Sequence, residues 1–278
     1  MDSIEKIGNS IIQHGRYNDR IYLMKLDPAD MPSLLDEMDA LAEKEKYSKI
    51  FTKVPESFKE LLCNHNYLCE ASIPLYYDGK EAAVIMSKFL DDKRSINSLN
   101  EMHEDVIKTA LSKEKGLHST LPSEFTIRKC EKRDIEQMAD VYQKTFDTYP
   151  FPIHDPDYLL KTIEDNVVYF GVFKDDNVVA LSSAEIDYDH SSVEMTDFAT
   201  LPEFRGKGLS SHLLRKMDKE MKASGIRTAY TIARASSYGM NIVFAKCGYE
   251  FCGRLVNNTN ISGNIESMNI WYLDIRTD

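Results

Sequence analysis

Apolar residues recur at helical spacing in several segments of the chain, which predicts amphipathic helices. The predicted helices are residues 33–46, 98–113, 134–145, 208–223 and 237–247, with a short one starting at Pro156. Runs rich in β-branched and aromatic residues lie between them and predict strands. The predicted strands are residues 20–26, 47–54, 67–76, 82–89, 125–129, 167–173, 178–186, 192–200, 228–233, 249–255 and 266–273.

This order predicts an α/β (α+β) protein with two domains, because 278 residues exceed the usual size of one domain. Residues 113–123 contain Gly116 and Pro122 among polar residues and predict a linker. We therefore expect a small α/β accessory domain in residues 1–118 and a second domain in residues 124–278. No internal repeat and no catalytic motif is evident in the first half, whose expected role is to pack, dimerise or shape a pocket.

Composition narrows the class of partner. The formal net charge is -11, and an acidic chain repels phosphate backbones, so we expect no nucleic acid. The first ten residues hold no long apolar run, so we expect neither a signal peptide nor a membrane span. The five cysteines have no metal-ligand spacing and suit reduced thiols in the cytoplasm, so no metal is expected. A homodimer is compatible with this composition.

One loop carries chemistry. Residues 201–210 lie between a predicted strand and an amphipathic helix and include Gly206 and Gly208. A glycine-rich turn at a helix N-terminus directs several backbone N–H groups at one point and forms an anion site. A dinucleotide fingerprint would need a third glycine where Ser211 stands, and the spacing of a nucleoside-triphosphate loop is absent. An ordinary strand-to-helix turn remains open from the residues alone.

The loop resembles the acetyl-CoA motif of the GNAT acetyltransferases, here Arg205-x-x-Gly208-x-Ser210, where serine departs from the usual glycine or alanine. Residues 243–249 resemble the second signature of that family, and the likeness covers roughly residues 125–275. It implies a mixed, mostly antiparallel sheet flanked by helices, with acetyl-CoA as co-substrate and no metal. The implied coenzyme-binding residues are Phe198, Ala199, Thr200, Arg205, Gly206, Lys207, Gly208, Leu209, Ser210 and Phe244.

Acetyl transfer needs a neutral amine, and a carboxylate can remove the extra proton. Asp197 and Glu194 lie on the strand that leads into the loop, and their spacing of three predicts opposite faces of the sheet. We favour Asp197 as the base; a solvated strand carboxylate is the alternative. The family often places a tyrosine acid where this chain has Phe244, so Tyr238 is the candidate acid, with simple packing as its alternative.

More closely, the chain resembles the β-lysine N-acetyltransferases, for example in residues 149–153, 194–200, 233–236, 257–261 and 266–269. The resemblance implies acetylation of the distal amine of β-lysine, a small-molecule substrate whose product is an osmolyte. Arg234 could hold the carboxylate as a fork, or form a surface salt bridge instead. The other candidate substrate-binding residues are Tyr149, Phe151, Asn257, Asn258 and Asn260, although the asparagines also suit a turn. Another small amine as substrate, or a non-catalytic acetyl-CoA sensor, remains an alternative.

Overall fold

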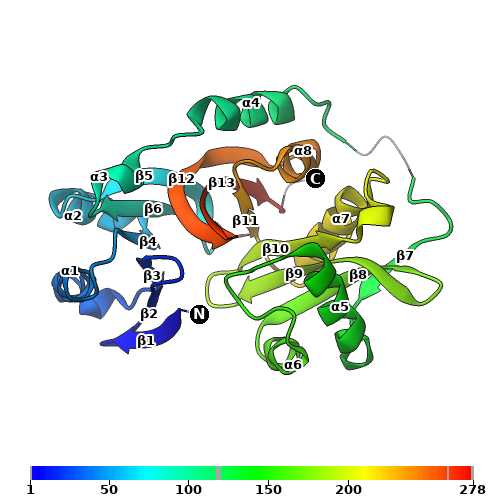
Figure 1. The fold of residues 1–278 in the computed structure, drawn as a ribbon, viewed down its shortest axis with the longest axis horizontal. Coiled ribbons are helices and arrows are strands. Elements are labelled where there is room, and N and C mark those ends of the chain that lie inside the picture. The colour runs from blue at the N-terminus through cyan, green and yellow to red at the C-terminus, as the bar shows by residue number, and fades with distance from the viewer. Residues whose placement is uncertain (1, 117–119, 262, 277–278) are drawn as a thin grey trace.

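A computed structural model describes residues 2–116, 120–261 and 263–276, and within them thirteen strands form one continuous sheet (Figure 1). The strand order is β1-β2-β3-β4-β6-β5-β12-β13-β11-β10-β9-β8-β7. The predicted linker includes residues 117–119, which lie outside the described residues. No helix in the described part of the chain is long and apolar enough to cross a membrane.

The N-terminal half supplies one end of this sheet, drawn from blue to cyan in Figure 1. Its elements are β1 (Ser3–Ile7), β2 (Ser10–Gly15), β3 (Arg20–Lys25), α1 (Ser33–Glu45), β4 (Lys49–Pro55), α2 (Lys59–Asn64), β5 (Leu68–Tyr77), β6 (Glu81–Phe89), α3 (Asp92–Ser95) and α4 (Asn100–Leu111).

The C-terminal half supplies the other end, and its elements follow the order that the sequence predicts. They are β7 (Thr126–Lys129), α5 (Ile135–Thr145), α6 (Pro156–Glu164), β8 (Val167–Lys174), β9 (Asn177–Asp187), β10 (Ser192–Thr200), α7 (Leu209–Ala223), β11 (Thr228–Arg234), α8 (Tyr238–Lys246), β12 (Glu250–Ile261) and β13 (Asn264–Asp274). The expected mixed sheet flanked by helices is confirmed.

The helices cover both faces of the C-terminal half. Alternate residues of β8 face opposite layers: Tyr169 and Phe173 pack with α5 and α6, while Phe170 and Val172 pack with α7. Helix α4, which precedes the predicted domain boundary, packs on α8 and places Ile107 in the α7 layer. The division into residues 1–118 and 124–278 stays a prediction, and the two parts share this core.

The two halves share one topology. From β1 to β6 the chain runs through three antiparallel strands, a helix, a strand parallel to the third, a second helix and a final hairpin, in the order β1-β2-β3-β4-β6-β5. From β8 to β13 the same path gives the order β8-β9-β10-β11-β13-β12. The N-terminal half is therefore a second, shorter copy of the C-terminal fold, although the sequence reveals no repeat.

Strand registers make this correspondence residue by residue. The row of paired residues Gln13, Tyr22, Phe51 and Ser87 in the first copy matches the row Glu185, Glu194, Tyr230 and Tyr272 in the second. The hairpins β5–β6 and β12–β13 also carry their irregularities at matching places, between Cys69 and Ala71 and between Phe251 and Gly253. The two copies therefore agree in the register of their paired residues as well as in strand order.

The copies meet where β5 pairs with β12, and the pair is Ala71 with its own counterpart, Gly253. Antiparallel strands that pair counterpart with counterpart are arranged as by a two-fold rotation. The approach is close, because a Cβ on Gly253 would lie 2.3 Å from the carbonyl oxygen of Glu70. The φ of Gly253 is +137°, which side chains of L-residues rarely adopt.

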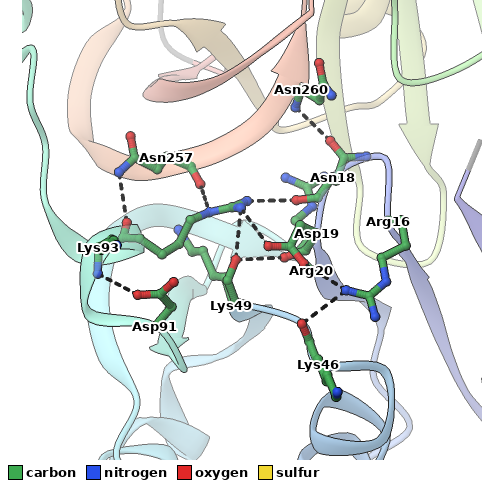
Figure 2. A network of polar contacts seen from close by, with 12 residues as sticks. Arg16, Asn18, Asp19, Arg20, Lys46, Lys49, Asp91, Lys93, Asn257 and Asn260 are labelled. Atoms are coloured by element: carbon green, nitrogen blue, oxygen red, sulfur yellow. Dashed lines mark hydrogen bonds and ion pairs between the residues drawn. The ribbon is translucent and has the colours of Figure 1, made fainter.

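Polar contacts reinforce this junction (Figure 2). The Arg94 side chain donates to the carbonyl oxygens of Asn257 (2.6 Å) and Asn18 (2.8 Å), so it bridges β12 and the β2–β3 turn. Asn257 returns a hydrogen bond from Nδ2 to the Arg94 carbonyl at 2.9 Å. The backbone amide of Asn260 donates to Oδ1 of Asn18 at 2.8 Å. The two copies are thus held in one relative position.

The glycine at the junction gives a stability prediction. We expect Gly253→Ala to lower the free energy of unfolding by about 2–4 kcal/mol, because it adds both an unfavourable φ and a contact with β5. Gly239→Ala is the matched control, since Gly239 lies in α8 and a Cβ added there would meet no atom within 4 Å. The control should be neutral or stabilising by about 0.5–1 kcal/mol in urea unfolding. Equal stability of the two variants would contradict the close junction.

Candidate functional site

A cleft opens where β10 leaves its neighbour β11. The two strands pair in parallel only from Ser192 to Glu194, opposite Thr228 to Tyr230, although both continue well beyond. The gap is lined by Phe198 of β10, Ala233 of β11 and Phe244 of α8, among others. Its open strand edges are free to pair with an extended ligand, as the predicted pantetheine site requires.

The glycine-rich loop closes one end of β10. Gly206 and Gly208 have φ of +78° and +73°, and Gly208 is the N-cap of α7. Within the described residues, the amides of Gly206 through Ser210 donate no hydrogen bond to the protein. A Cβ on either glycine would meet no atom within 4 Å, so the space in front of the loop is open. Free amides at a helix N-terminus suit an anion, so this loop stays the predicted pyrophosphate site.

The predicted coenzyme residues divide by what their side chains do. Phe198 and Phe244 meet edge to face at 5.5 Å and line the cleft. Thr200 accepts from Nε of Arg205 at 3.1 Å through its carbonyl oxygen, which fixes the loop to the strand. Ala199 and Leu209 are buried in the core, so only their backbone groups are available to a coenzyme.

The first copy has no such loop. The segment between β3 and α1 contains no glycine, and it carries Asp27 and Asp30. Both carboxylates are held in the turn, since Asp27 accepts from the Ala29 amide and Asp30 accepts from the amides of Asn9 and Ser10. Two carboxylates at this place repel a pyrophosphate. The described chain thus offers one coenzyme loop in two copies of the fold.

A cavity of about 790 Å³ lies between the copies, over the junction. Matching positions of the two copies line it together, such as Tyr22 with Glu194 and Phe51 with Tyr230. Tyr149 and Phe151, both predicted to bind substrate, lie in its wall. Tyr149 and Asp197 line both this cavity and the β10–β11 cleft, so the two spaces meet at Asp197.

The structure corrects the predicted orientation of Asp197 and Glu194, which face the same cavity. Strand alternation fails because β10 carries a bulge between Thr196 and Ala199 in its pairing with β9, and Asp197 itself has φ of +56°. The extra residue turns the Asp197 side chain back to the face that Glu194 occupies. The sequence of β10 contains no glycine or proline that would predict this bulge.

Asp197 is held firmly. The Tyr149 hydroxyl donates to Oδ1 at 2.5 Å, and the Ser183 hydroxyl donates to Oδ2 at 2.7 Å. Burial raises the pKa of Asp197, while the hydrogen bonds from Tyr149, Ser183 and Thr196 act in the opposite direction. A carboxylate with a raised pKa and fixed orientation at the meeting of two cavities is suited to take up a proton.

Two further carboxylates stand on the same wall. Burial raises the pKa of Glu194, against the effects of Lys53 and of a hydrogen bond from Tyr230. Glu185, which the sequence analysis missed, is open to the cavity yet surrounded by protein, and its pKa lies well above the usual range because of burial and of the neighbouring Glu194 and Asp197. Three carboxylates in one wall make a site for ammonium groups, whose charge would relieve their mutual repulsion.

The first copy contributes basic residues to the same cavity. Arg20 of β3 is 5% exposed, and Lys53 of β4 donates to the Tyr230 hydroxyl at 2.9 Å. The stacked rings of Tyr22 and Phe51, 4.1 Å apart, lie beside them. The sequence analysis missed both cations, because no motif in the first half distinguishes them from structural residues.

Arg234 and Tyr238 do not occupy the predicted places. Arg234 lines the cleft, but it is paired with Glu266 through both Nε (2.9 Å) and Nη2. A guanidinium already bound to a carboxylate is a poor clamp for a second one. Tyr238 is 39% exposed and donates to Asp105 of α4 at 2.5 Å, so it points away from both cavities. Its predicted role as the acid does not fit this position.

The three asparagines that were predicted to bind substrate have different surroundings in the structure. They lie in β12 rather than in a turn, because that strand continues to Ile261. Asn257 and Asn260 hydrogen-bond backbone of the first copy, so the substrate-binding role predicted for them does not fit. Asn258 lines the cavity, and its Oδ1 is buried without a partner among the described residues.

Comparison with known proteins agrees with this geometry. The model of the Acetyltransferase (GNAT) family matches residues 135–249, which include the cleft and the loop. The beta-lysine N(6)-acetyltransferase of Methanococcus maripaludis is 44% identical over 98% of each chain. The chain belongs to the GNAT acetyltransferase family.

Two other relatives extend this likeness over both copies of the fold. The N-acetyltransferase YodP of Bacillus subtilis is 34% identical over 98% of each chain. The beta-lysine N(6)-acetyltransferase of Methanosarcina mazei is 36% identical over 84% of this chain and 94% of its own. The likeness therefore includes the N-terminal copy, which the family model does not reach. As a GNAT enzyme, the protein transfers an acetyl group from acetyl-CoA.

The loop geometry gives a prediction for the coenzyme. Gly208→Val should weaken acetyl-CoA binding at least tenfold in calorimetry, because a β-branched residue disfavours φ of +73° and fills the space in front of the amides. Gly225→Val is the control, since Gly225 follows α7 with φ of +84° and equally open space. It should cost similar stability and leave acetyl-CoA affinity unchanged. Unchanged affinity in the Gly208 variant would place the coenzyme elsewhere.

Proposed function

We propose that the protein acetylates the distal amine of β-lysine and releases Nε-acetyl-β-lysine and CoA. The observation that supports this substrate is the polarity of the cavity, whose lining from the C-terminal copy includes the carboxylates of Glu185, Glu194 and Asp197, while the N-terminal copy contributes the buried Arg20. β-Lysine carries two ammonium groups and one carboxylate, so it suits a site that is acidic where the acetyl group arrives and basic at the far side. Two relatives named for this activity match nearly the whole chain or most of it.

The chemistry requires a proton to leave before the nitrogen attacks. An alkylammonium with a pKa near 10.4 loses its proton at pH 7 at a cost of about 4–5 kcal/mol. We propose that Asp197 receives this proton, since it lies where the cleft for the thioester meets the substrate cavity. The nitrogen then bonds to the thioester carbonyl carbon, the C–S bond breaks, and the second proton that the nitrogen loses neutralises the departing thiolate, which leaves as CoA. Glu194 and Glu185 hold the ammonium groups.

We also propose that the product serves as a compatible solute in the cytoplasm. Acetylation removes one positive charge, so a substrate of net charge +1 becomes a neutral zwitterion that can accumulate without counterions. The five cysteines are all unpaired in the structure, in keeping with a reducing compartment.

An amine panel tests the substrate. Purified enzyme is assayed with acetyl-CoA and each of four amines: β-lysine, lysine, spermidine and an aminoglycoside. We expect the highest kcat/KM for β-lysine, and mass spectrometry identifies the product. We expect a single added acetyl group on the distal nitrogen. Preference for a polyamine, or acetylation of the β-amino group, would contradict the proposal, and turnover of none of these amines would favour an acetyl-CoA sensor.

Replacing the base should change rate more than binding. We expect Asp197→Asn to lower kcat about 10²–10⁴-fold at pH 7, with acetyl-CoA affinity little changed, because the coenzyme is held by the loop and the strand edge. The defect should shrink as pH rises, since solvent then deprotonates the amine. Glu185→Gln and Glu194→Gln are the matched variants, and they should mainly raise KM for the amine. A pH-independent defect in the Asp197 variant would assign it to binding or structure.

A further inference from the structure

Arg20 is a buried cation with no carboxylate partner. It lines the cavity, and among the described residues no acidic group lies within ion-pair distance of its guanidinium. Its Nη1 donates to the Asn258 carbonyl and to the Thr259 hydroxyl at 2.9 Å, and its Nε has no partner among the described residues. Burial lowers its pKa to about 9, and the neighbouring Arg94 adds to this effect, while Tyr22 and Asp2 oppose it. Such an arrangement is costly unless an anion binds there.

The other cations near the junction mostly differ from Arg20 in this respect. Arg94 lies 3.6 Å from Asp19, and Arg234 is paired with Glu266. Lys25, at the edge of the cavity, is exposed and paired with Asp189 at 2.9 Å. Lys53 stands over the rings of Tyr76 (4.8 Å) and Tyr230 (5.1 Å). Burial acts to lower its pKa, but the neighbouring tyrosines and Glu194 raise that pKa well above the usual range, so Lys53 already has an acidic neighbour.

We propose that Arg20 of the N-terminal copy binds the carboxylate of the amino-acid substrate and thereby determines its specificity. This inference rests on the proposed function, and it gives the N-terminal copy its role. The first copy has lost the coenzyme loop but keeps the cavity-facing positions, where Tyr22 and Gln13 replace the carboxylates of Glu194 and Glu185. One copy therefore supplies the acidic wall and the coenzyme, and the other supplies the anion site.

The arrangement also orients the substrate. With the carboxylate at Arg20, the distal amine of the substrate is directed to the wall that holds Asp197, while a diamine has no group to place at Arg20. Arginine suits this task because its planar fork binds a carboxylate with two hydrogen bonds. Desolvated hydrogen bonds between charged groups are worth about 1.5–3 kcal/mol, or about 10–100-fold in kcat/KM.

Pairs of substrates that differ only in the carboxylate test this inference. The pairs are β-lysine with pentane-1,4-diamine, lysine with cadaverine, and ornithine with putrescine. Wild-type enzyme should prefer the amino acid in each pair that it accepts. Arg20→Met should lower kcat/KM for the amino acid about 10–100-fold and leave kcat/KM for the diamine unchanged. The kcat/KM of Arg20→Lys for the amino acid should lie between those of the wild type and Arg20→Met, because lysine keeps the charge but lacks the planar fork of arginine.

Arg16→Met is the matched control, because Arg16 precedes β3 but lies outside the cavity and is largely exposed. It should leave both members of each pair unchanged, and acetyl-CoA affinity of every variant verifies folding. Equal losses on both members of a pair, or no loss in the Arg20 variants, would overturn the inference. If the variants lose activity on lysine but not on cadaverine, and β-lysine is not acetylated, the inference stands and the proposed function is wrong. If the enzyme acetylates only the diamines, both are wrong.

Discussion

The close backbone contact between Gly253 and Ala71 is the constraint on which the rest of the structure depends. It joins two copies of one fold into a single sheet, and only a residue without a Cβ allows strands to approach this way at φ of +137°. Because counterpart pairs with counterpart, the cavity lies over the junction and receives side chains from equivalent strands of both copies. The substrate site is therefore a property of the joined copies, and neither copy contains it alone.

Charge is distributed unequally across that junction. The C-terminal copy places Glu185, Glu194 and Asp197 in one wall, where burial raises the pKa of each. The N-terminal copy places the buried Arg20 in the same cavity. In the absence of substrate, Lys53 compensates the carboxylates only in part and Arg20 has no carboxylate at ion-pair distance among the described residues; such uncompensated charge is the usual cost of a site prepared for a charged ligand. A zwitterion with two ammonium groups compensates both walls at once.

Local signals explain what the sequence could predict. The coenzyme loop was predictable because Gly206 and Gly208 precede an amphipathic helix, and the order of elements followed from periodicity. The position of Asp197 was not, since a bulge in β10 reverses strand alternation without a glycine or proline to mark it. Arg20 was missed because its partners Asn258 and Thr259 are more than two hundred positions away. The duplication is visible in strand order and register, whereas the residues at matching positions of the two copies differ.

The central claim is that one substrate molecule is held between the two copies while one coenzyme binds to the C-terminal copy. A crystal structure with CoA and β-lysine tests it most directly. We expect one CoA per chain in the β10–β11 cleft with its pyrophosphate on residues 205–210, the distal amine of β-lysine beside Asp197, and its carboxylate at Arg20. A carboxylate bound at Arg234, or a second CoA on the segment between β3 and α1, would contradict the account.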